Sequence, residues 1–461
     1  MVAEKDIIVA FELGSSAIRG IAGRKEADGS FHILAIDQEQ ISGSIRRGTI
    51  YNINKTTSAI TRIKERLNER LSVNIKRAYV GVAGQSVHTV FNKVSKSYDT
   101  KVKVTQEIID SLMDTNRAVQ YPDREILEVA PQEYHLGIDT ASDPIGIQVD
   151  KIDGRYLNII ARSILQENIR RCMRDADLEV VELFITPLEV AKALLPDTDK
   201  RSGCALVDIG AETTTVAIFT KNILRHLATI PLGGKNVTND IATLKKVEVE
   251  EAEAIKLKYG KAIAPVEKEE NPKMIRISND RNVSEEEIQR ITSARYDEII
   301  SNVWNQIDKG KWQNDLLSGI TITGGASYMS DMAEALAKMN NIDANKIKTA
   351  KELLSTMPCD PRVNKTAKGF NAAIALLMQG SENCIGEDIV ADEPFTEPKE
   401  EVVSGTVTEE IVVVTSEDPK NEEEQKEETK GEGKKEKKSK GPGFISKIGN
   451  ILGKLVNEED E

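Results

Sequence analysis

The chain has 461 residues and a formal net charge of −13 at pH 7; 30% of its residues are charged and only 4% are aromatic. This length exceeds one hydrophobic core and suggests about three domains, and the acidic balance argues against nucleic acid as the main partner. The four cysteines are widely spaced without a CxxC pair, so we expect reduced thiols in a cytoplasmic protein. No apolar run approaches the ~20 residues of a membrane span, and the N-terminus lacks a signal-peptide pattern.

The first predicted element is a β-hairpin over Ile7–Gly23. It has an apolar run, an acid (Glu12), a glycine (Gly14), two hydroxyl residues (Ser15 and Ser16) and a second apolar run. This order is typical of a strand, a tight polar turn and a second strand. The glycine lets the backbone approach a ligand closely, and hydroxyl groups can donate to phosphate oxygens.

Strands and helices then alternate up to residue 83, which predicts a layered α/β domain. Phe31–Asp37 and Lys76–Val82 are predicted strands, and Thr56–Leu71 has apolar residues at helical spacing. From Gly84 to Ser163 the alternation breaks. The elements predicted there are strands at Val87–Tyr98, Val129–Gly137 and Tyr156–Ala161, and a helix at Gln106–Val119 capped by Thr105.

A helix at Gln166–Asp177, a strand at Glu179–Ile185 and a helix at Leu188–Leu195 follow in the sequence. The next segment, Asp197–Gly203, is polar and turn-rich, so we expect it to form the boundary between two halves of the protein.

A second hairpin, Cys204–Phe219, repeats the order of the first. Asp208 ends its first strand, Gly210 lies in the turn, and the hydroxyls of Thr213 and Thr214 follow. One such hairpin is most often an ordinary polar turn. Two of them, roughly 200 residues apart, suggest two similar half-structures facing each other across a cleft. Mg²⁺, a hard cation that prefers oxygen ligands, is the natural bridge between the Asp208 carboxylate and phosphate.

The second half continues with a strand at Ile223–Ile230 and ends with a strand–glycine–helix turn at Gly319–Ala326, where an adenosine could lie against bare backbone. The other elements predicted in this half are helices at Lys235–Thr243, Val249–Tyr259, about 285–307 (capped by Ser284) and Asp331–Met339, and a strand near Met274–Ile277. A final helix is predicted at Thr366–Met378.

The order of these motifs resembles the ATPase fold shared by actin, sugar kinases and Hsp70 chaperones. Further segments narrow the resemblance, over about residues 5–380, to the bacterial cell-division protein family FtsA. They are Pro131–Tyr134 (PQEY), Asp143–Gly146 (DPIG), Gly233–Asp240 (GGKNVTND), Glu253–Gly260 (EAIKLKYG) and Arg295–Glu298 (RYDE).

The resemblance implies an α/β, actin-like ATPase fold with two halves around a nucleotide cleft. The first half comprises residues 5–83, 166–200 and 360–380, and the second comprises 203–359 with 234–310 as its outer subdomain. Residues 84–165 form an inserted FtsA-type subdomain, which actin lacks.

The resemblance also implies that ATP lies between the halves with Mg²⁺, held through Asp208 and water. The residues that match the nucleotide-binding pattern are Glu12, Gly14, Ser15, Ser16, Asp208, Gly210, Thr213, Thr214, Gly233, Gly234, Glu253, Lys256, Gly324, Gly325 and Ala326.

Several positions depart from that pattern. Glu12 stands where Asp is usual, Ala211 and Glu212 replace a Gly-Gly pair, and Thr215 replaces an acid. The Glu212 carboxylate would repel a triphosphate unless it turned outward or reached a metal ion. We therefore expect ATP binding with weak or absent hydrolysis.

The C-terminal region changes character from residue 382. Residues 382–440 are rich in Glu and Lys and are predicted to be a disordered tether, apart from a short β-prone island at Thr408–Ser416. Residues 443–457 are predicted to be an amphipathic membrane-targeting helix, which the FtsA family also carries. Its apolar stripe comprises Phe444, Ile445, Ile448, Ile451, Leu452, Leu455 and Val456.

The functional hypothesis is an ATP-binding adaptor that polymerises at the cytoplasmic face of the inner membrane. The resemblance implies that it binds the tubulin-like division protein FtsZ, other copies of itself, anionic lipid and later division proteins. A sugar or carboxylate kinase of the same fold is the alternative, but it would need a catalytic Asp and would gain nothing from a tethered amphipathic helix. An Hsp70-like chaperone would need a β-rich domain after residue 380.

Overall fold

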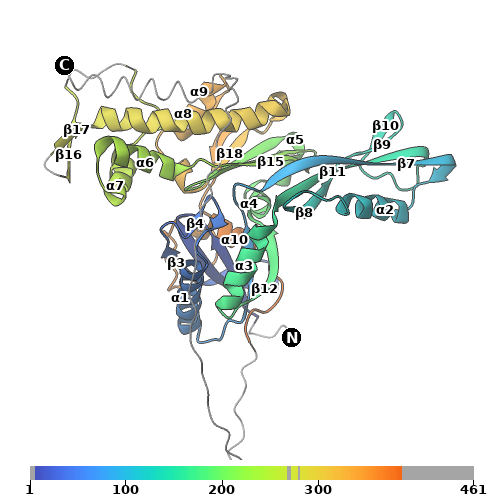
Figure 1. Cartoon of the computed structure of the whole chain (residues 1–461), viewed down its shortest axis with the longest axis horizontal. Coiled ribbons are helices and arrows are strands. Elements are labelled where there is room, and N and C mark those ends of the chain that lie inside the picture. The colour runs from blue at the N-terminus through green and yellow to red at the C-terminus, as the bar shows by residue number, and fades with distance from the viewer. Residues whose placement is uncertain (1–5, 267–270, 279–280, 387–461) are drawn as a thin grey trace, which may run out of the picture. The chain divides into compact units, whose positions relative to one another are not determined.

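The computed structural model of the chain describes residues 6–266, 271–278 and 281–386 (Figure 1). These residues belong to one compact unit. The predicted tether, its β-prone island and the membrane-targeting segment lie outside the described residues.

The first half is built on a five-stranded sheet with the order β12-β6-β1-β2-β3. β2 runs antiparallel to both β1 and β3, whereas β6 runs parallel to β1 and β12 parallel to β6. The strands are β1 (Ile8–Leu13), β2 (Ala17–Lys25), β3 (Phe31–Gln40), β6 (Arg77–Val82) and β12 (Glu179–Ile185).

Helices pack against this sheet and bury its apolar residues. α1 (Ile53–Leu71) packs on β2, β3 and α3 (Ser163–Asp175), whereas α10 (Asn371–Leu377) packs on β1, β2, β6 and α4 (Thr186–Leu194). α1 begins three residues earlier than predicted because the Asn52 side chain accepts a hydrogen bond from the Lys55 N–H and caps it.

The second half repeats this topology. Its strands have the order β15-β14-β13-β18-β19, with β13, β14 and β15 antiparallel and β18 and β19 parallel to β13. The repeat confirms the prediction of two similar α/β halves. The elements are β13 (Cys204–Ile209), β14 (Thr214–Thr220), β15 (Ile223–Ile230), β18 (Ile320–Thr323), β19 (Ile347–Thr349), α6 (Gly234–Lys245), α7 (Val249–Tyr259), α8 (Glu285–Lys309), α9 (Met332–Met339), β16 (Met274–Ile277) and β17 (Arg281–Ser284).

Residues 84–162 form a third group of strands that joins the sheet of the second half. His88 of β7 pairs with Ala228 of β15, so the two sets of strands make one ten-stranded sheet (Figure 1). This group has a small core of its own, which includes Leu112, Ile152 and Tyr156. Its elements are β7 (His88–Lys103), α2 (Gln106–Arg117), β8 (Arg124–Pro131), β9 (Tyr134–Leu136), β10 (Asp139–Ala141) and β11 (Gln148–Arg162).

Two predicted elements of the first 203 residues have different forms in the structure. The strand predicted at Val129–Gly137 is two strands, β8 and β9, and Glu133 between them forms an ion pair with Arg225. The boundary segment Asp197–Gly203 contains a short helix, α5 (Asp197–Ser202), whose acidic first turn and basic last turn suit the helix dipole.

Two further helix predictions differ in detail. Thr105 precedes α2, but its side chain makes no capping hydrogen bond. The helix predicted at Thr366–Met378 begins only at Asn371, because Asn364 holds residues 364–366 in a side-chain turn and Gly369 has a φ of +81°.

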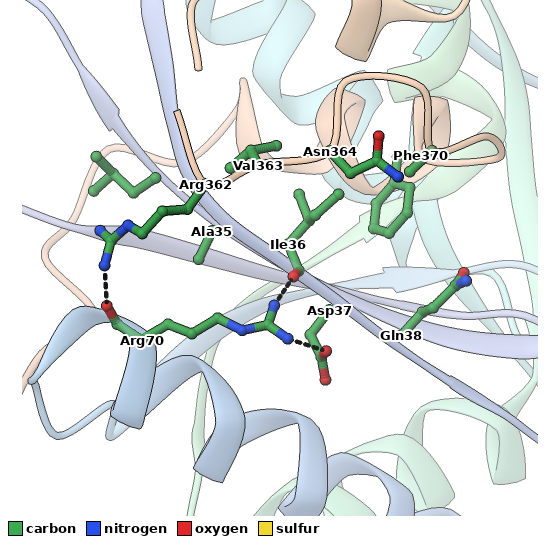
Figure 2. A pocket seen from close by; sticks show the side chains of 11 residues that line it. Ala35, Ile36, Asp37, Gln38, Arg70, Arg362, Val363, Asn364 and Phe370 are labelled. Atoms are coloured by element: carbon green, nitrogen blue, oxygen red, sulfur yellow. Dashed lines mark hydrogen bonds and ion pairs between the residues drawn. The ribbon is translucent and has the colours of Figure 1, made fainter. Parts of the chain in front are cut away.

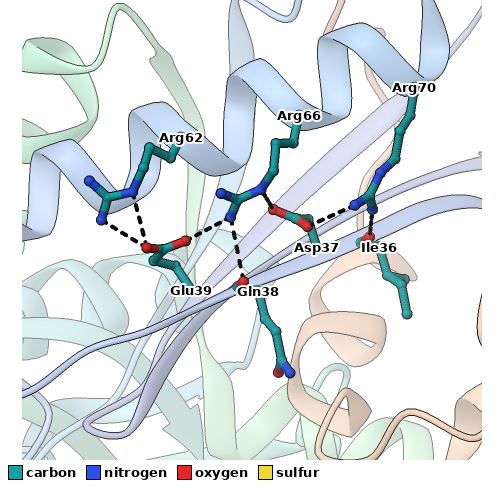
Figure 3. A network of polar contacts seen from close by, with 7 residues as sticks. All are labelled: Ile36, Asp37, Gln38, Glu39, Arg62, Arg66 and Arg70. Carbon is teal, nitrogen blue, oxygen red and sulfur yellow. Dashed lines mark hydrogen bonds and ion pairs between the residues drawn. The ribbon is translucent and has the colours of Figure 1, made fainter.

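The outer edge of β3 is held by arginines from α1. Arg62, Arg66 and Arg70 are spaced four residues apart and therefore share one side of the helix (Figure 3). Arg66 Nε lies 2.5 Å and Arg70 Nη2 3.1 Å from the Asp37 carboxylate, and Arg62 and Arg66 both pair with Glu39. Arg70 also donates to the Ile36 carbonyl. These contacts occupy backbone acceptors that an edge strand would otherwise present to another chain.

Asp37→Ala is expected to lower the free energy of unfolding of the full chain by about 2 kcal/mol. The Asp37 side chain is only 9% exposed, so its removal leaves two arginines without their shared acceptor in a partly dry position. Urea unfolding followed by circular dichroism measures the change. Glu26→Ala is the matched control, since its ion pair with Arg24 is more than a third exposed and should contribute about 0.5 kcal/mol or less. Equal losses in the two variants would contradict the expectation.

Of the helices in the described part of the chain, none is long and apolar enough to cross a membrane.

Candidate nucleotide-binding site

The two predicted hairpins place an acid at the same position in each half. Glu12 is the fifth of six residues of β1 and faces Arg19 across the hairpin; Asp208 is the fifth of six residues of β13 and faces Thr215. The Glu12 carboxylate forms an ion pair with Arg19 Nη1 at 2.8 Å. Because Thr215 stands where the first half has an arginine, Asp208 lacks a cationic partner directly across its hairpin.

The pKa of Asp208, in the second half, depends on charged residues of the first half. The surrounding protein removes water from this carboxylate, and the negative charge of Glu12 adds to that effect, so the pKa of Asp208 is raised to about 6. The positive charge of Arg19 opposes the shift. Two carboxylates from different halves therefore act on one another, and a divalent cation would relieve both the desolvation and the repulsion. The residues fit Mg²⁺ in this sense, with Asp208 as the group that would hold it directly or through water.

Glycines bring the backbone of three segments into close contact around Asp208. A Cβ at Gly324, where φ is +88°, would lie 2.2 Å from Asp208 Oδ1, and one at Gly233 would lie 2.6 Å from the Gly210 carbonyl oxygen. A Cβ at Gly234 would lie 2.8 Å from the Cβ of Ala326. Larger side chains at these positions would push the segments apart.

Gly325 differs from the other glycines, because a Cβ there would meet nothing within 4 Å. Its backbone borders open space next to the packed glycines. This is the position at which we expect an adenosine from the sequence. After Gly324 the chain forms a short 3-10 helix, Gly325–Tyr328, before α9, rather than the direct helix that was predicted.

The predicted residues of α7 lie beside the start of α6. Lys256 is buried and its Nζ donates to Glu253 Oε2 at 2.7 Å, to Thr238 Oγ1 at 2.9 Å and to the Gly234 carbonyl at 3.2 Å. These three bonds use all three ammonium donors. Lys256 therefore fixes the Gly233–Gly234 turn. Its bond to Glu253 involves only Oε2 of that carboxylate.

The hydroxyl residues of the two turns have different environments. The Thr214 hydroxyl is buried and donates to the Leu232 carbonyl at 2.9 Å, so it ties the second turn to the segment before α6. The Ser15 hydroxyl accepts a hydrogen bond from the Gly48 N–H at 2.9 Å. Ser16 is exposed, and Thr213 is partly exposed.

Glu212 points inward, and its side chain is only 15% exposed. Its Oε1 lies 2.8 Å from Lys235 Nζ, and its Oε2 accepts a 2.7 Å hydrogen bond from the Arg47 N–H of the first half. Lys235, Arg47 and Arg19 are site residues that sequence reasoning missed. Arg19 was recognisable, since a hairpin turn of this length places it opposite Glu12, but the Arg47 contact spans 165 residues and left no local pattern.

A separate cavity of about 510 Å³ lies away from these residues, between β3, the end of α1 and residues 362–370 (Figure 2). Ile36 and Phe370 line it together with Arg70 and Arg362, and Arg362 donates to the Arg70 carbonyl. No residue of the candidate nucleotide site lines it.

Two halves of equal topology, each with an acid-bearing hairpin, define a protein of the actin-like ATPase fold. A chain of the solved PilM–PilN type IV pilus biogenesis complex has this fold, with a TM-score of 0.58 and 15% sequence identity over 80% of this chain and 97% of its own.

Sequence comparison places the chain more narrowly. Residues 205–372 match the family model described as "Cell division protein FtsA", and residues 84–160 match "SHS2 domain inserted in FTSA". The cell division protein FtsA of Porphyromonas gingivalis is 30% identical over 420 residues, which cover 86% of this chain and 88% of that protein. FtsA of Pseudomonas aeruginosa is 28% identical over 333 residues, covering 71% of this chain and 79% of its own length. The chain belongs to the FtsA family of cell-division proteins.

Proposed function

We propose that this chain binds ATP with Mg²⁺ between its halves, polymerises on the cytoplasmic face of the inner membrane at the division site, and tethers FtsZ there. Later division proteins are then recruited to the assembly. The observation that carries the nucleotide part is the opposition of Glu12 and Asp208, which occupy equivalent positions of two equivalent hairpins and interact electrostatically across the halves.

The proposed nucleotide lies with its phosphates between the two turns and its adenosine over Gly324, Gly325 and Ala326. Gly14, Gly210 and Gly233 then allow the backbone of each turn to approach the phosphates. Turnover of ATP is slow or absent in this proposal. Glu12 is held by Arg19, and Thr215 stands opposite Asp208 where the family pattern has an acid. The chain then acts through assembly rather than catalysis.

The docking surface proposed for FtsZ lies on the outer part of the second half, residues 234–310. Three of its basic side chains have internal partners: Lys245 pairs with Glu287, Arg290 with Glu286, and Arg281 donates to the Lys245 and Lys246 carbonyls. These contacts favour Lys246 and Lys258, two exposed lysines of the same segment, as the residues that meet an acidic peptide. Lys258 is exposed on α7, close to the exposed Leu257.

Co-sedimentation with anionic vesicles tests the whole proposal. We expect the full chain to carry FtsZ into the lipid pellet when ATP and Mg²⁺ are present, and to carry much less without nucleotide. The double substitution Lys246→Glu and Lys258→Glu should reduce the FtsZ in the pellet by roughly tenfold while the chain itself still pellets, because it reverses two charges at the docking surface.

The matched control is Lys101→Glu with Lys103→Glu, two exposed lysines of β7 outside that surface. FtsZ recovery that is independent of nucleotide would contradict the proposal. Equal loss of FtsZ in both double variants would contradict the docking surface alone.

A further inference from the structure

A short hairpin of the first half reaches the second half at the candidate site. It consists of β4 (Ile45–Arg46) and β5 (Thr49–Ile50), joined by Arg47 and Gly48. Both turn residues have positive φ values, +50° and +75°, as a two-residue turn between antiparallel strands requires. A Cβ at Gly48 would lie 2.4 Å from the Gly84 Cα, so only glycine fits there.

The backbone of this turn contacts three parts of the protein. The Gly48 N–H donates to Ser15 Oγ at 2.9 Å in the first phosphate turn, and the Arg47 N–H donates to Glu212 Oε2 at 2.7 Å in the second. The Arg47 carbonyl accepts a 2.9 Å hydrogen bond from the Gln85 N–H, where the inserted subdomain begins. Two residues thus link both phosphate turns and the insertion.

Glu212 is the side chain on which the link between the halves depends. It is only 15% exposed, and its two oxygens engage Lys235 Nζ and the Arg47 N–H. A cation and a backbone N–H are the donors that phosphate oxygens also use in proteins. Glu212 is therefore an internal anion that occupies two donors of the kind that phosphate oxygens use.

We propose that Glu212 is a specificity-determining residue that sets the preference of the site for nucleoside triphosphate or diphosphate, an inference that rests on the proposed nucleotide binding. In the proposed site, the terminal phosphate of a bound triphosphate would add negative charge near the turn that carries Glu212. A triphosphate would therefore repel the carboxylate and displace it from both Arg47 and Lys235, whereas a diphosphate would leave these contacts intact. Wild-type protein consequently binds ATP less tightly, relative to ADP, than the same site without this charge.

Displacing Glu212 also releases the Arg47–Gly48 turn from the second half. The turn remains bonded to Ser15 and Gln85, so the change passes to the start of the inserted subdomain through the Arg47 carbonyl. In this way the presence of a terminal phosphate alters the contact that ties the insertion to the site.

Calorimetric titration of the full chain with Mg²⁺–ATP and Mg²⁺–ADP tests the inference. Glu212→Gln removes the charge and keeps the shape, and it should tighten ATP binding by roughly tenfold while ADP affinity changes by less than about twofold. Glu334→Gln is the matched control, since it neutralises an exposed carboxylate of α9. An ATP-to-ADP affinity ratio that is the same in wild type and Glu212→Gln would overturn the inference.

Hydrogen exchange of the nucleotide-free protein provides a second measurement that does not depend on affinity. In Glu212→Ala, the Arg47 amide loses its acceptor and should exchange at least about tenfold faster, whereas the Gly48 amide, bonded to Ser15, should not. Unchanged exchange at Arg47 would also overturn the inference. If wild-type protein bound neither nucleotide, the proposed function would fail, and the inference with it.

Discussion

Asp208→Ala is expected to weaken Mg²⁺-dependent ATP binding by at least about a hundredfold. Asp208 is the acid whose pKa is raised by desolvation and by Glu12, and the residue opposite it is Thr215 rather than an arginine. Its charge is therefore available to a metal ion, whereas the charge of Glu12 is already compensated by Arg19. Calorimetry with Mg²⁺ and with a chelator separates the metal-dependent part of the binding.

The raised pKa of Asp208 adds a pH dependence to this prediction. Below about pH 6 the carboxyl group takes up a proton and cannot ligate a cation, so the metal-dependent affinity should fall by up to about tenfold for each further pH unit. The affinity falls as the pH falls, because metal binding requires the deprotonated Asp208 carboxylate. The Asp208→Asn variant is the control, since it has no charge to lose and should show a flatter profile. If Asp208→Ala bound ATP as tightly as wild type in the presence of Mg²⁺, the assignment of Asp208 to the nucleotide site would be wrong.

Ile451→Glu is expected to release the chain from anionic vesicles, with a loss of at least about tenfold in the bound fraction. Ile451 lies in the apolar stripe of Gly443–Val456, a segment outside the described residues. On a helix, the substitution places a charge within the apolar face that would enter the lipid, and it removes an apolar side chain worth about 1.5–3 kcal/mol when fully buried. Vesicle flotation of the full chain measures the bound fraction.

Asn450→Glu is the matched control for this variant, because residue 450 lies on the opposite side of the same predicted helix and receives the same charge. It should float nearly as well as wild type, and both variants should bind ATP as wild type does. The membrane proposal would fail if Ile451→Glu rose with the lipid as well as Asn450→Glu.

Local sequence patterns predicted the parts of this fold that depend on neighbouring residues. Glu179–Ile185, Ile223–Ile230 and Val249–Tyr259 have the predicted bounds, since their polarity pattern and flanking turn residues fix both type and length. The two acid–glycine hairpins were also recognisable, because each is complete within about twenty residues. Their repeat then predicted the two halves.

Contacts between distant residues left no such pattern. The joining of β7 to β15 depends on a backbone pair, His88 with Ala228, that any residue type could make. The partners of Glu212 were equally hidden, since one of them is a backbone N–H whose position is set by an unrelated turn. In the candidate site, sequence reasoning therefore found the segments that form it and named Glu212, but it missed the partners of Glu212, which are Lys235 and the Arg47 N–H.

The junction between β7 and β15 has a mechanical consequence. The inserted strands meet β15 through the His88–Ala228 pair, the Thr89 hydroxyl bonded to the backbone of Leu227, and the contacts of Gln132 and Glu133 with Leu224 and Arg225. Beyond His88, β7 continues for 15 residues, of which Thr89–Ser97, Val102 and Lys103 pair with β11. At ~3.3 Å per residue such a ribbon is roughly 50 Å long, so a rotation of about 5° at its base moves its far end by about 4 Å. With this length, the inserted strands would act as a lever arm and amplify a small rotation at their base into a larger displacement at their far end.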